Sequence, residues 1–96
     1  MDMIQFEWDN NKNALNKKKH KISFEEASTV FYDDRAILFD DPEHSYEEDR
    51  FLIIGTTMSS KICIVSHCYR DNDAVIRIIS ARKANKAEQN VYEMNL

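Results

Sequence analysis

The stretch RFLIIGTTMSSKICIVSHCYRDNDAVIRIISA, residues 50–81, decides the fold because it predicts three neighbouring β-strands. Runs rich in Ile, Val and aromatic residues cover residues 50–57, 61–69 and 75–81, and such runs are typical of strands. The two segments between these runs have the length of hairpin loops, so consecutive strands should run antiparallel. We therefore expect an antiparallel sheet at the centre of the molecule.

The residues before this stretch predict a strand followed by two helices. Apolar and polar residues alternate over residues 4–8, which indicates a half-buried strand, and a helix capped at residue 9 or 10 then runs to about Lys19. Ser23 and Glu26 have the spacing of a capping box, in which the Ser oxygen accepts from a backbone N–H and the Glu side chain reaches back. The second helix is expected to bury a stripe that consists of Phe24, Ala27, Val30 and Phe31.

A short strand over residues 36–39 ends at the polar run 40–45, and a last helix follows the central stretch. Asn85 and Glu88 have the capping-box spacing and begin this helix. Its apolar stripe, expected to face the sheet, consists of Ala87, Val91 and Met94. The elements together predict an α+β fold: a small antiparallel sheet with two N-terminal helices and a C-terminal helix, and one sheet face left uncovered.

Length and composition limit the class of protein. A chain of 96 residues forms one domain, expected over residues 1–96, and a hydrophobic content of 43% excludes a disordered tail. No apolar run approaches the ~20 residues of a membrane span, and no charged segment precedes an apolar one at the N-terminus. We therefore expect a cytoplasmic protein. Cys63 and Cys68 should lie on opposite faces of one strand, which excludes a disulfide between them and favours two small buried hydrophobic residues.

Charge is segregated along the chain although the net charge is only −4. Five lysines and His20 crowd residues 12–21, which contain no acid, whereas residues 25–49 hold ten acids and one base. Six bases follow between residues 61 and 86. Local basic surfaces can hold phosphate at any net charge because screening limits interactions to about 8–10 Å. A solvated surface is the alternative interpretation of each charged stretch.

Several motifs occur in an order that resembles the BrnT toxin family, nearly over the whole chain. The departures are Lys21 where the family usually has Gly, Asp34 where Pro is common, and Asn85 where Thr is common. If the Gly has a positive φ, Lys21 strains or reshapes the turn between the first two helices. The matching motifs are Phe6-Glu-Trp-Asp9, Lys12, Asn16, Lys19-His20, Ser23-Phe-Glu-x-Ala27, His44-Ser-x-x-Glu48-x-Arg50, Ile54-Gly55, Arg77-Ile-Ile-Ser-Ala-Arg-Lys-Ala84, Glu88 and Tyr92.

The resemblance implies a fold like that of the RelE/ParE toxins and a ribonuclease toxin of a type II toxin–antitoxin system that inhibits translation and growth. It implies RNA cleavage without a metal or other cofactor. It also implies neutralisation by a BrnA-like ribbon-helix-helix antitoxin that is encoded beside the toxin. The pair would repress its own promoter, so operator DNA would be bound only through the antitoxin.

Cleaving RNA without a metal needs a base for the 2′-hydroxyl, cations around the phosphate and an acid for the leaving 5′-oxygen. The candidate catalytic residues are His44, Glu48, Arg50, Arg77, Arg82 and His20, and the candidate RNA-binding residues are Lys19 and Lys83. The three histidines are 24 and 23 residues apart, so no short-spaced pair of metal ligands exists. The acids of residues 40–49 could hold Mg²⁺ weakly, but a solvated loop is the favoured interpretation.

Each candidate has a structural alternative. Glu48 and Arg50 can form a surface ion pair, and Arg77 in its apolar strand can be paired with an acid instead of facing a site. His20 can be a cation that stabilises the end of its helix through the helix dipole, with no catalytic role. We interpret Trp8, His67 and Tyr92 as structural residues, although a Tyr can also act as an acid. For the whole protein, the alternative is a non-catalytic module of the same fold that binds a partner protein or RNA.

Overall fold

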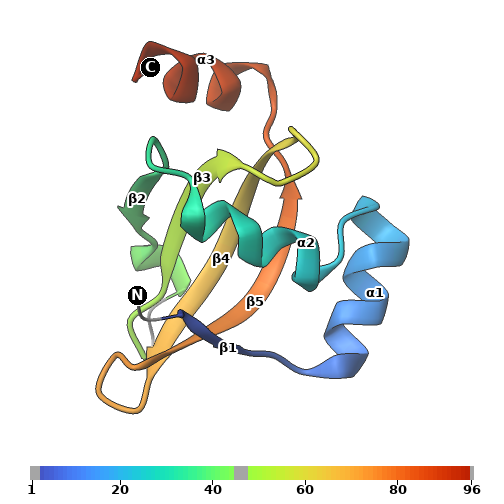
Figure 1. The fold of residues 1–96 in the computed structure, drawn as a ribbon, viewed down its shortest axis with the longest axis vertical. Coiled ribbons are helices and arrows are strands. Elements are labelled where there is room, and N and C mark those ends of the chain that lie inside the picture. Colours follow the sequence, from blue (N-terminus) through green and yellow to red (C-terminus); the bar gives the residue numbers. More distant parts are fainter. Residues whose placement is uncertain (1–2, 45–47, 96) are drawn as a thin grey trace.

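The computed structural model describes residues 3–44 and 48–95 and contains a five-stranded mixed sheet with the strand order β1-β5-β4-β3-β2 (Figure 1). The strands are β1 Gln5–Glu7, β2 Ile37–Asp40, β3 Phe51–Thr56, β4 Ile62–Arg70 and β5 Val75–Lys83. The helices are α1 Asn10–His20, α2 Phe24–Ser28 and α3 Lys86–Met94, with 3₁₀ turns η1 Thr29–Tyr32 and η2 Pro42–His44. None of the helices in the described part of the chain has the length and apolar character needed to cross a bilayer.

The three central strands pair antiparallel, as predicted, but the sheet as a whole is not antiparallel. β1 lies parallel to β5, with Gln5 opposite Val75 and Glu7 opposite Arg77. A short hairpin loop requires antiparallel pairing only of the two strands that it joins. β1 and β5 are separated by most of the chain, so they can pair parallel. The prediction of an all-antiparallel sheet was therefore wrong at this edge.

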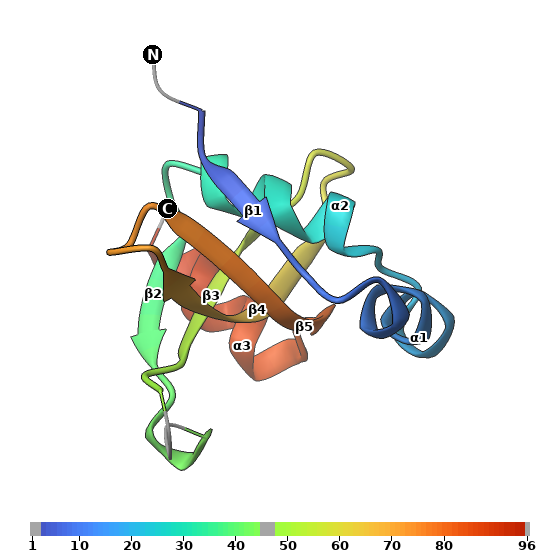
Figure 2. The ribbon, with the colours of Figure 1, turned by 90° about the horizontal axis from the view of Figure 1, so that it is seen from below.

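The two faces of the sheet are covered unequally. α2 and η1 pack on one face with α1 beside them, and α3 lies on the opposite face at one end of the sheet (Figures 1 and 2). The main core lies under α2: Phe24, Ala27 and Val30 are completely buried against Ile53, Val65 and other strand residues, which confirms the predicted stripe. Gly55 permits this contact, because a Cβ there would lie 2.9 Å from Val30 Cγ1.

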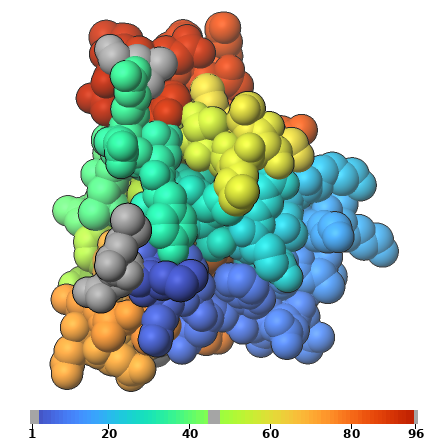
Figure 3. Space-filling view, in the orientation of Figure 1, coloured from blue at the N-terminus to red at the C-terminus, as the bar shows by residue number. Residues whose placement is uncertain are grey.

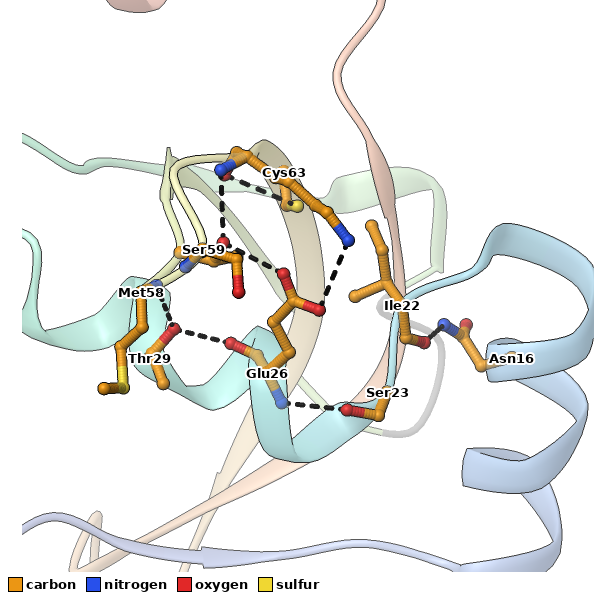
Figure 4. A network of polar contacts seen from close by, with 10 residues as sticks. Asn16, Ile22, Ser23, Glu26, Thr29, Met58, Ser59 and Cys63 are labelled. Atoms are coloured by element: carbon orange, nitrogen blue, oxygen red, sulfur yellow. Dashed lines mark hydrogen bonds and ion pairs between the residues drawn. The ribbon is translucent and has the colours of Figure 1, made fainter.

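Ser23 caps α2 as predicted, but Glu26 does not complete the expected box. The Ser23 Oγ accepts from the Glu26 N–H at 3.0 Å. The Glu26 carboxylate instead accepts from Thr57 Oγ1 at 3.1 Å and lies 3.6 Å from Lys61 Nζ (Figure 4). Glu26 therefore fastens α2 to the β3–β4 turn, and the space-filling view shows the two packed together (Figure 3). At α3, both halves of the predicted Asn85–Glu88 capping box are formed.

α3 is rotated relative to the prediction. Val91 and Met94 are 48% and 86% exposed, whereas Tyr92 is buried against the apolar cluster that includes Ile54 and Ile64. The prediction was wrong for Met94, which is exposed, whereas Val91 lies at the edge of the interface and lines a cavity with Ile54 and Ile64. Tyr92 is the residue buried there because its large ring buries more area and its hydroxyl has partners. The interpretation of Tyr92 as a structural residue is confirmed.

Cys63 and Cys68 are both free and buried. Cys63 belongs to the main core, and the odd separation along β4 places Cys68 on the other face. The prediction of two buried hydrophobic residues on opposite faces is confirmed. Burial raises the pKa of the Cys63 thiol to about 11, so it stays protonated at neutral pH.

Candidate active-site groove on the open sheet face

The sheet face opposite α2 carries a groove with a volume of about 420 Å³, which we call the open-face groove. Its floor consists of alternate residues of β3, β4 and β5, namely Leu52, Ile64, Ser66, Ser80 and Arg82. Its sides are lined by His20, from the end of α1, and by Asp41, Glu43, His44 and Arg50, which lie between β2 and β3. Ser66 belongs to no motif, and Ser80 lies inside the Arg77–Ala84 motif without having been singled out as a candidate.

His20 reaches the groove because a buried amide fastens α1 to β5. Asn16, the buried residue of α1, donates from Nδ2 to the carbonyl oxygens of Ile22 at 2.9 Å and Ala81 at 2.8 Å. Its Oδ1 accepts from the Ala81 N–H at 3.1 Å. The three hydrogen bonds between the Asn16 side chain and the main chain therefore hold α1 in place, because the helix has little apolar surface to bury.

His44 is the last residue of η2, and Arg50 immediately precedes β3. The Nδ1 of His44 lies 3.1 Å from each carboxylate oxygen of Asp41, so this acid orients the imidazole. The Asp41 N–H donates to the Arg50 carbonyl oxygen at 2.9 Å, which holds the two ends of the segment between β2 and β3 together. Among the described residues, no three His, Cys, Asp or Glu side chains are grouped as a metal site.

Arg82 is held by α3. Its two terminal nitrogens donate to the two carboxylate oxygens of Glu88, each at 2.8 Å, in a bidentate pair. These bonds from Arg82 hold the pKa of Glu88 below its usual range. Glu88 also accepts from the Asn85 N–H at 2.8 Å, so one carboxylate both caps α3 and orients Arg82.

Two candidates, Glu48 and Arg77, do not line the groove. The ion pair of Glu48 is with Arg70 of β4. Burial alone would raise the pKa of Glu48, but the hydrogen bond and charge of Arg70, with a smaller effect from Arg50, lower it. Arg77 donates to Glu7 of β1 at 2.7 Å and lies roughly 16 Å from Arg82 along β5, at about 3.3 Å per residue.

The lysine candidates also lie outside the groove. Lys19 is exposed in the last turn of α1. Lys83 is paired with Cys63, so its side chain belongs to the α2-covered side of the sheet, opposite to Arg82. Arg70 has no motif in the sequence, and only the register of β4 brings it to Glu48, 22 residues away.

His67 is a core residue, as interpreted from the sequence. Its side chain is completely buried among the rings of Phe31, Phe51 and Tyr69. Burial lowers its pKa from the ordinary value of 6.5, so it remains neutral at neutral pH. His67 faces the α2 side of the sheet and therefore does not belong to the groove.

A small α+β protein with Arg and His side chains gathered in a groove has a site suited to binding an anion. Residues 8–88 match the family model described as "Ribonuclease toxin, BrnT, of type II toxin-antitoxin system", and the chain belongs to this family. The 1.1 Å crystal structure of the Brucella abortus ribonuclease toxin BrnT shares the fold, with a TM-score of 0.67 and 22% identity. The match covers 88% of this chain and 100% of that one. A search of curated proteins found no match.

Proposed function

We propose that the open-face groove is the active site of an endoribonuclease that cuts RNA without a metal ion. The observation that supports this proposal is convergence. His20, His44, Arg50 and Arg82 are spread over 62 residues of sequence, and all four line one groove. Two groups that can carry protons thereby lie beside two permanent cations, which is the set that this chemistry needs.

The reaction begins when the 2′-oxygen of a ribose attacks the adjacent phosphorus while a base takes its proton. The bond to the 5′-oxygen then breaks, and an acid protonates that oxygen, which leaves a 2′,3′-cyclic phosphate. His44 and His20 are the two proton carriers. Asp41 holds Nδ1 of His44 and stabilises the imidazolium that forms when Nε2 takes a proton, as an acid does beside a catalytic His.

Arg82 and Arg50 hold the phosphate. The charge on its oxygens increases in the transition state, so a positioned guanidinium stabilises that state more than the ground state. The bidentate contact with Glu88 makes Glu88 the positioning residue for Arg82. Arg77 and Glu48 have structural ion pairs instead, with Glu7 and Arg70.

The first prediction compares two arginines of the same sheet face. Arg82→Ala should lower the rate of RNA cleavage by about 10²- to 10³-fold, the usual cost of losing one transition-state donor. Arg70→Ala is the matched control, because Arg70 also has a carboxylate partner but does not line the groove. It should retain activity within a few-fold, with both variants folded by circular dichroism. Equal losses in the two variants would remove the groove from the mechanism.

The same assay tests the chemistry. Cleavage by the purified protein should persist in excess EDTA and leave 2′,3′-cyclic phosphate or 3′-phosphate ends. Cleavage that stops on chelation and leaves 5′-phosphate ends would mean metal-assisted hydrolysis. If the protein binds RNA and does not cut it under any condition, the chain is a non-catalytic module.

We further infer the partner and setting from the family. The antitoxin is of the BrnA-like ribbon-helix-helix type, the two proteins act in the cytoplasm, and together they repress their own promoter. The fold is of the RelE/ParE kind. An antitoxin that lies on the sheet face with Arg50 and Arg77 does not also face Lys83, whose side chain belongs to the other side of the sheet. Expression of this chain should stop growth, and coexpression with the adjacent reading frame should restore it.

A further inference from the structure

A second cavity of about 160 Å³ lies between α3 and the sheet, and we call it the α3 pocket. It is lined by Phe39, Leu52, Ile54, Ile64, Glu88 and Val91. Five of these six side chains are apolar, and they come from β2, β3, β4 and α3. Figure 2 shows α3 on the face of the sheet opposite to α2.

The α3 pocket and the open-face groove adjoin. Leu52 and Ile64 line both cavities, so their floors are continuous. Between them is the Arg82–Glu88 ion pair, of which Arg82 lines the groove and Glu88 lines the pocket. One surface therefore has a polar half, which holds Arg50 and Arg82 beside Asp41 and Glu43, and an apolar half, and the two halves meet at this ion pair.

The apolar half is not needed for the core. Phe39 and Val91 are 42% and 48% exposed, so two large apolar side chains flank an opening instead of being buried. Phe39 is on the edge strand β2, and its ring is on the same face as Leu52, its pairing partner. An exposed aromatic ring beside a groove that contains arginines resembles the stacking platforms with which proteins bind single-stranded nucleic acids.

We propose that the α3 pocket binds the base of a nucleotide whose phosphate lies in the open-face groove. The inference rests on the proposed function and adds a base-binding subsite to it. A nucleotide joins a flat, weakly polar base to an anionic phosphate, which matches the two adjoining halves of the surface. The base stacks on the Phe39 ring and contacts the aliphatic side chains of the floor.

Glu88 adds one polar contact to the pocket. A carboxylate has about four acceptor positions. Three are occupied by the two Arg82 nitrogens and the Asn85 N–H. The remaining position, on Oε2, accepts an N–H from the edge of the base. An ionised carboxylate has no proton, so Glu88 donates no hydrogen bond to the base.

The test uses binding without cleavage. The probes are homotrinucleotides of each of the four bases with 2′-O-methyl riboses, which lack the attacking hydroxyl, and the same trimer without bases. NMR titration of the wild-type protein should show that base-bearing trimers shift the methyl signals of Ile54 and Val91. The abasic trimer should shift only signals of the groove.

The variants separate stacking from general effects on β2. Phe39→Ala should weaken binding of the best base-bearing trimer at least fivefold, as expected for loss of one stacked base. Phe39→Tyr should retain wild-type affinity. Leu38→Ala is the matched control, because Leu38 is the adjacent exposed residue of the same strand and is on the other face. Its affinity should be unchanged.

Three outcomes overturn the proposal. The first is an abasic trimer that binds as tightly as every base-bearing one, and the second is wild-type affinity in Phe39→Ala. The third is a Phe39→Ala protein that binds RNA normally but escapes the antitoxin, which would assign the pocket to the antitoxin. Failure of the proposed function is distinguishable: no trimer, with or without bases, would then shift the signals of the groove.

Discussion

At the scale of single residues, Lys21 retains a backbone conformation that suits Gly. It ends α1 with φ 63° and ψ 24°, and its N–H donates to the Lys17 carbonyl oxygen. A residue with a Cβ in this left-handed region costs about 1 kcal/mol or more. The turn therefore keeps the left-handed conformation although Lys21 stands where the family usually has Gly, and the strain stays in the backbone.

The second prediction follows from this strain. Lys21→Gly should raise the free energy of unfolding by about 1 kcal/mol, which corresponds to about 4–8 °C in Tm for a domain of this size. The control is Lys18→Gly inside α1, which should lower the free energy of unfolding by about 1 kcal/mol. Urea denaturation measures both. The same sign in the two variants would contradict the assignment of strain to Lys21.

The third prediction concerns pH and His67. Because burial lowers the pKa of His67 in the folded protein, the unfolded chain binds a proton at a higher pH than the folded one does. The free energy of unfolding should therefore be highest above about pH 6.5, the unfolded value, and should decrease as the pH falls toward the folded pKa. Urea denaturation at pH 7.5, 6.5 and 5.5 measures this decrease.

His67→Gln should show a smaller decrease over that range than the wild-type protein shows. If His67→Gln does not fold, NMR titration of the imidazole in the wild-type protein gives the same answer. A His67 pKa at or above 6.5 would be inconsistent with the buried neutral ring.

At the scale of elements, α3 depends on a few polar contacts. The Tyr92 hydroxyl donates to Asp33 Oδ2 at 2.6 Å and accepts from Thr56 Oγ1 at 2.9 Å. Burial would raise the pKa of Asp33, but the hydrogen bonds from Tyr92 and from the Thr56 and Arg35 N–H groups outweigh it and lower the pKa. Because α3 lines the α3 pocket and its Glu88 holds Arg82 of the groove, these bonds position the candidate site as well as the helix.

The fourth prediction is that Tyr92→Phe lowers the free energy of unfolding by about 1.5–3 kcal/mol, the range for a hydrogen bond to a charged group. Amide hydrogen exchange in α3 should accelerate more than exchange in β4. Tyr32→Phe is the control, because Tyr32 is 54% exposed, and its effect should stay within about 0.5 kcal/mol. Uniform acceleration over the whole protein would show that the Tyr92 hydroxyl does not stabilise α3 specifically.

At the scale of the whole molecule, charge is distributed around the groove and not concentrated in it. Arg70, Arg77 and Arg82 each have a carboxylate partner on the sheet face that holds the groove. The last turn of α1, by contrast, carries Lys17, Lys18 and Lys19 together with His20, which lines the groove. The long-range attraction for an RNA backbone therefore comes from the end of α1, although the net charge is −4.

The fifth prediction tests this distribution. Binding of uncleavable 2′-O-methyl RNA should weaken as salt increases, with a slope of log K against log salt of about 0.7 for each phosphate contact. Lys18→Ala with Lys19→Ala should reduce the slope by up to about 1.4. Lys61→Ala with Lys86→Ala removes the same number of charges elsewhere and should leave the slope unchanged. Equal reductions by both pairs would show that only net charge matters.

The sequence by itself determined the features that depend on neighbours in the chain. The three central strands follow from residue type and loop length, the separation of Cys63 and Cys68 follows from strand alternation, and the α3 cap follows from the Asn85–Glu88 spacing. The family motifs also named all four candidates that line the groove. These rules are local, so no tertiary contact needs to be known.

Only the tertiary structure decided which residues share a site. The parallel pairing of β1, the burial of Tyr92 instead of Val91, and the binding of Glu26 to Thr57 each replace a local expectation with a contact between distant segments. The same holds for the candidates, since Glu48 and Arg77 have ion pairs with Arg70 and Glu7 and Lys83 belongs to the other face. Local spacing determines on which face of an element a side chain lies. Which residues that side chain contacts depends on how distant elements pack together, and no short stretch of the sequence determines that packing.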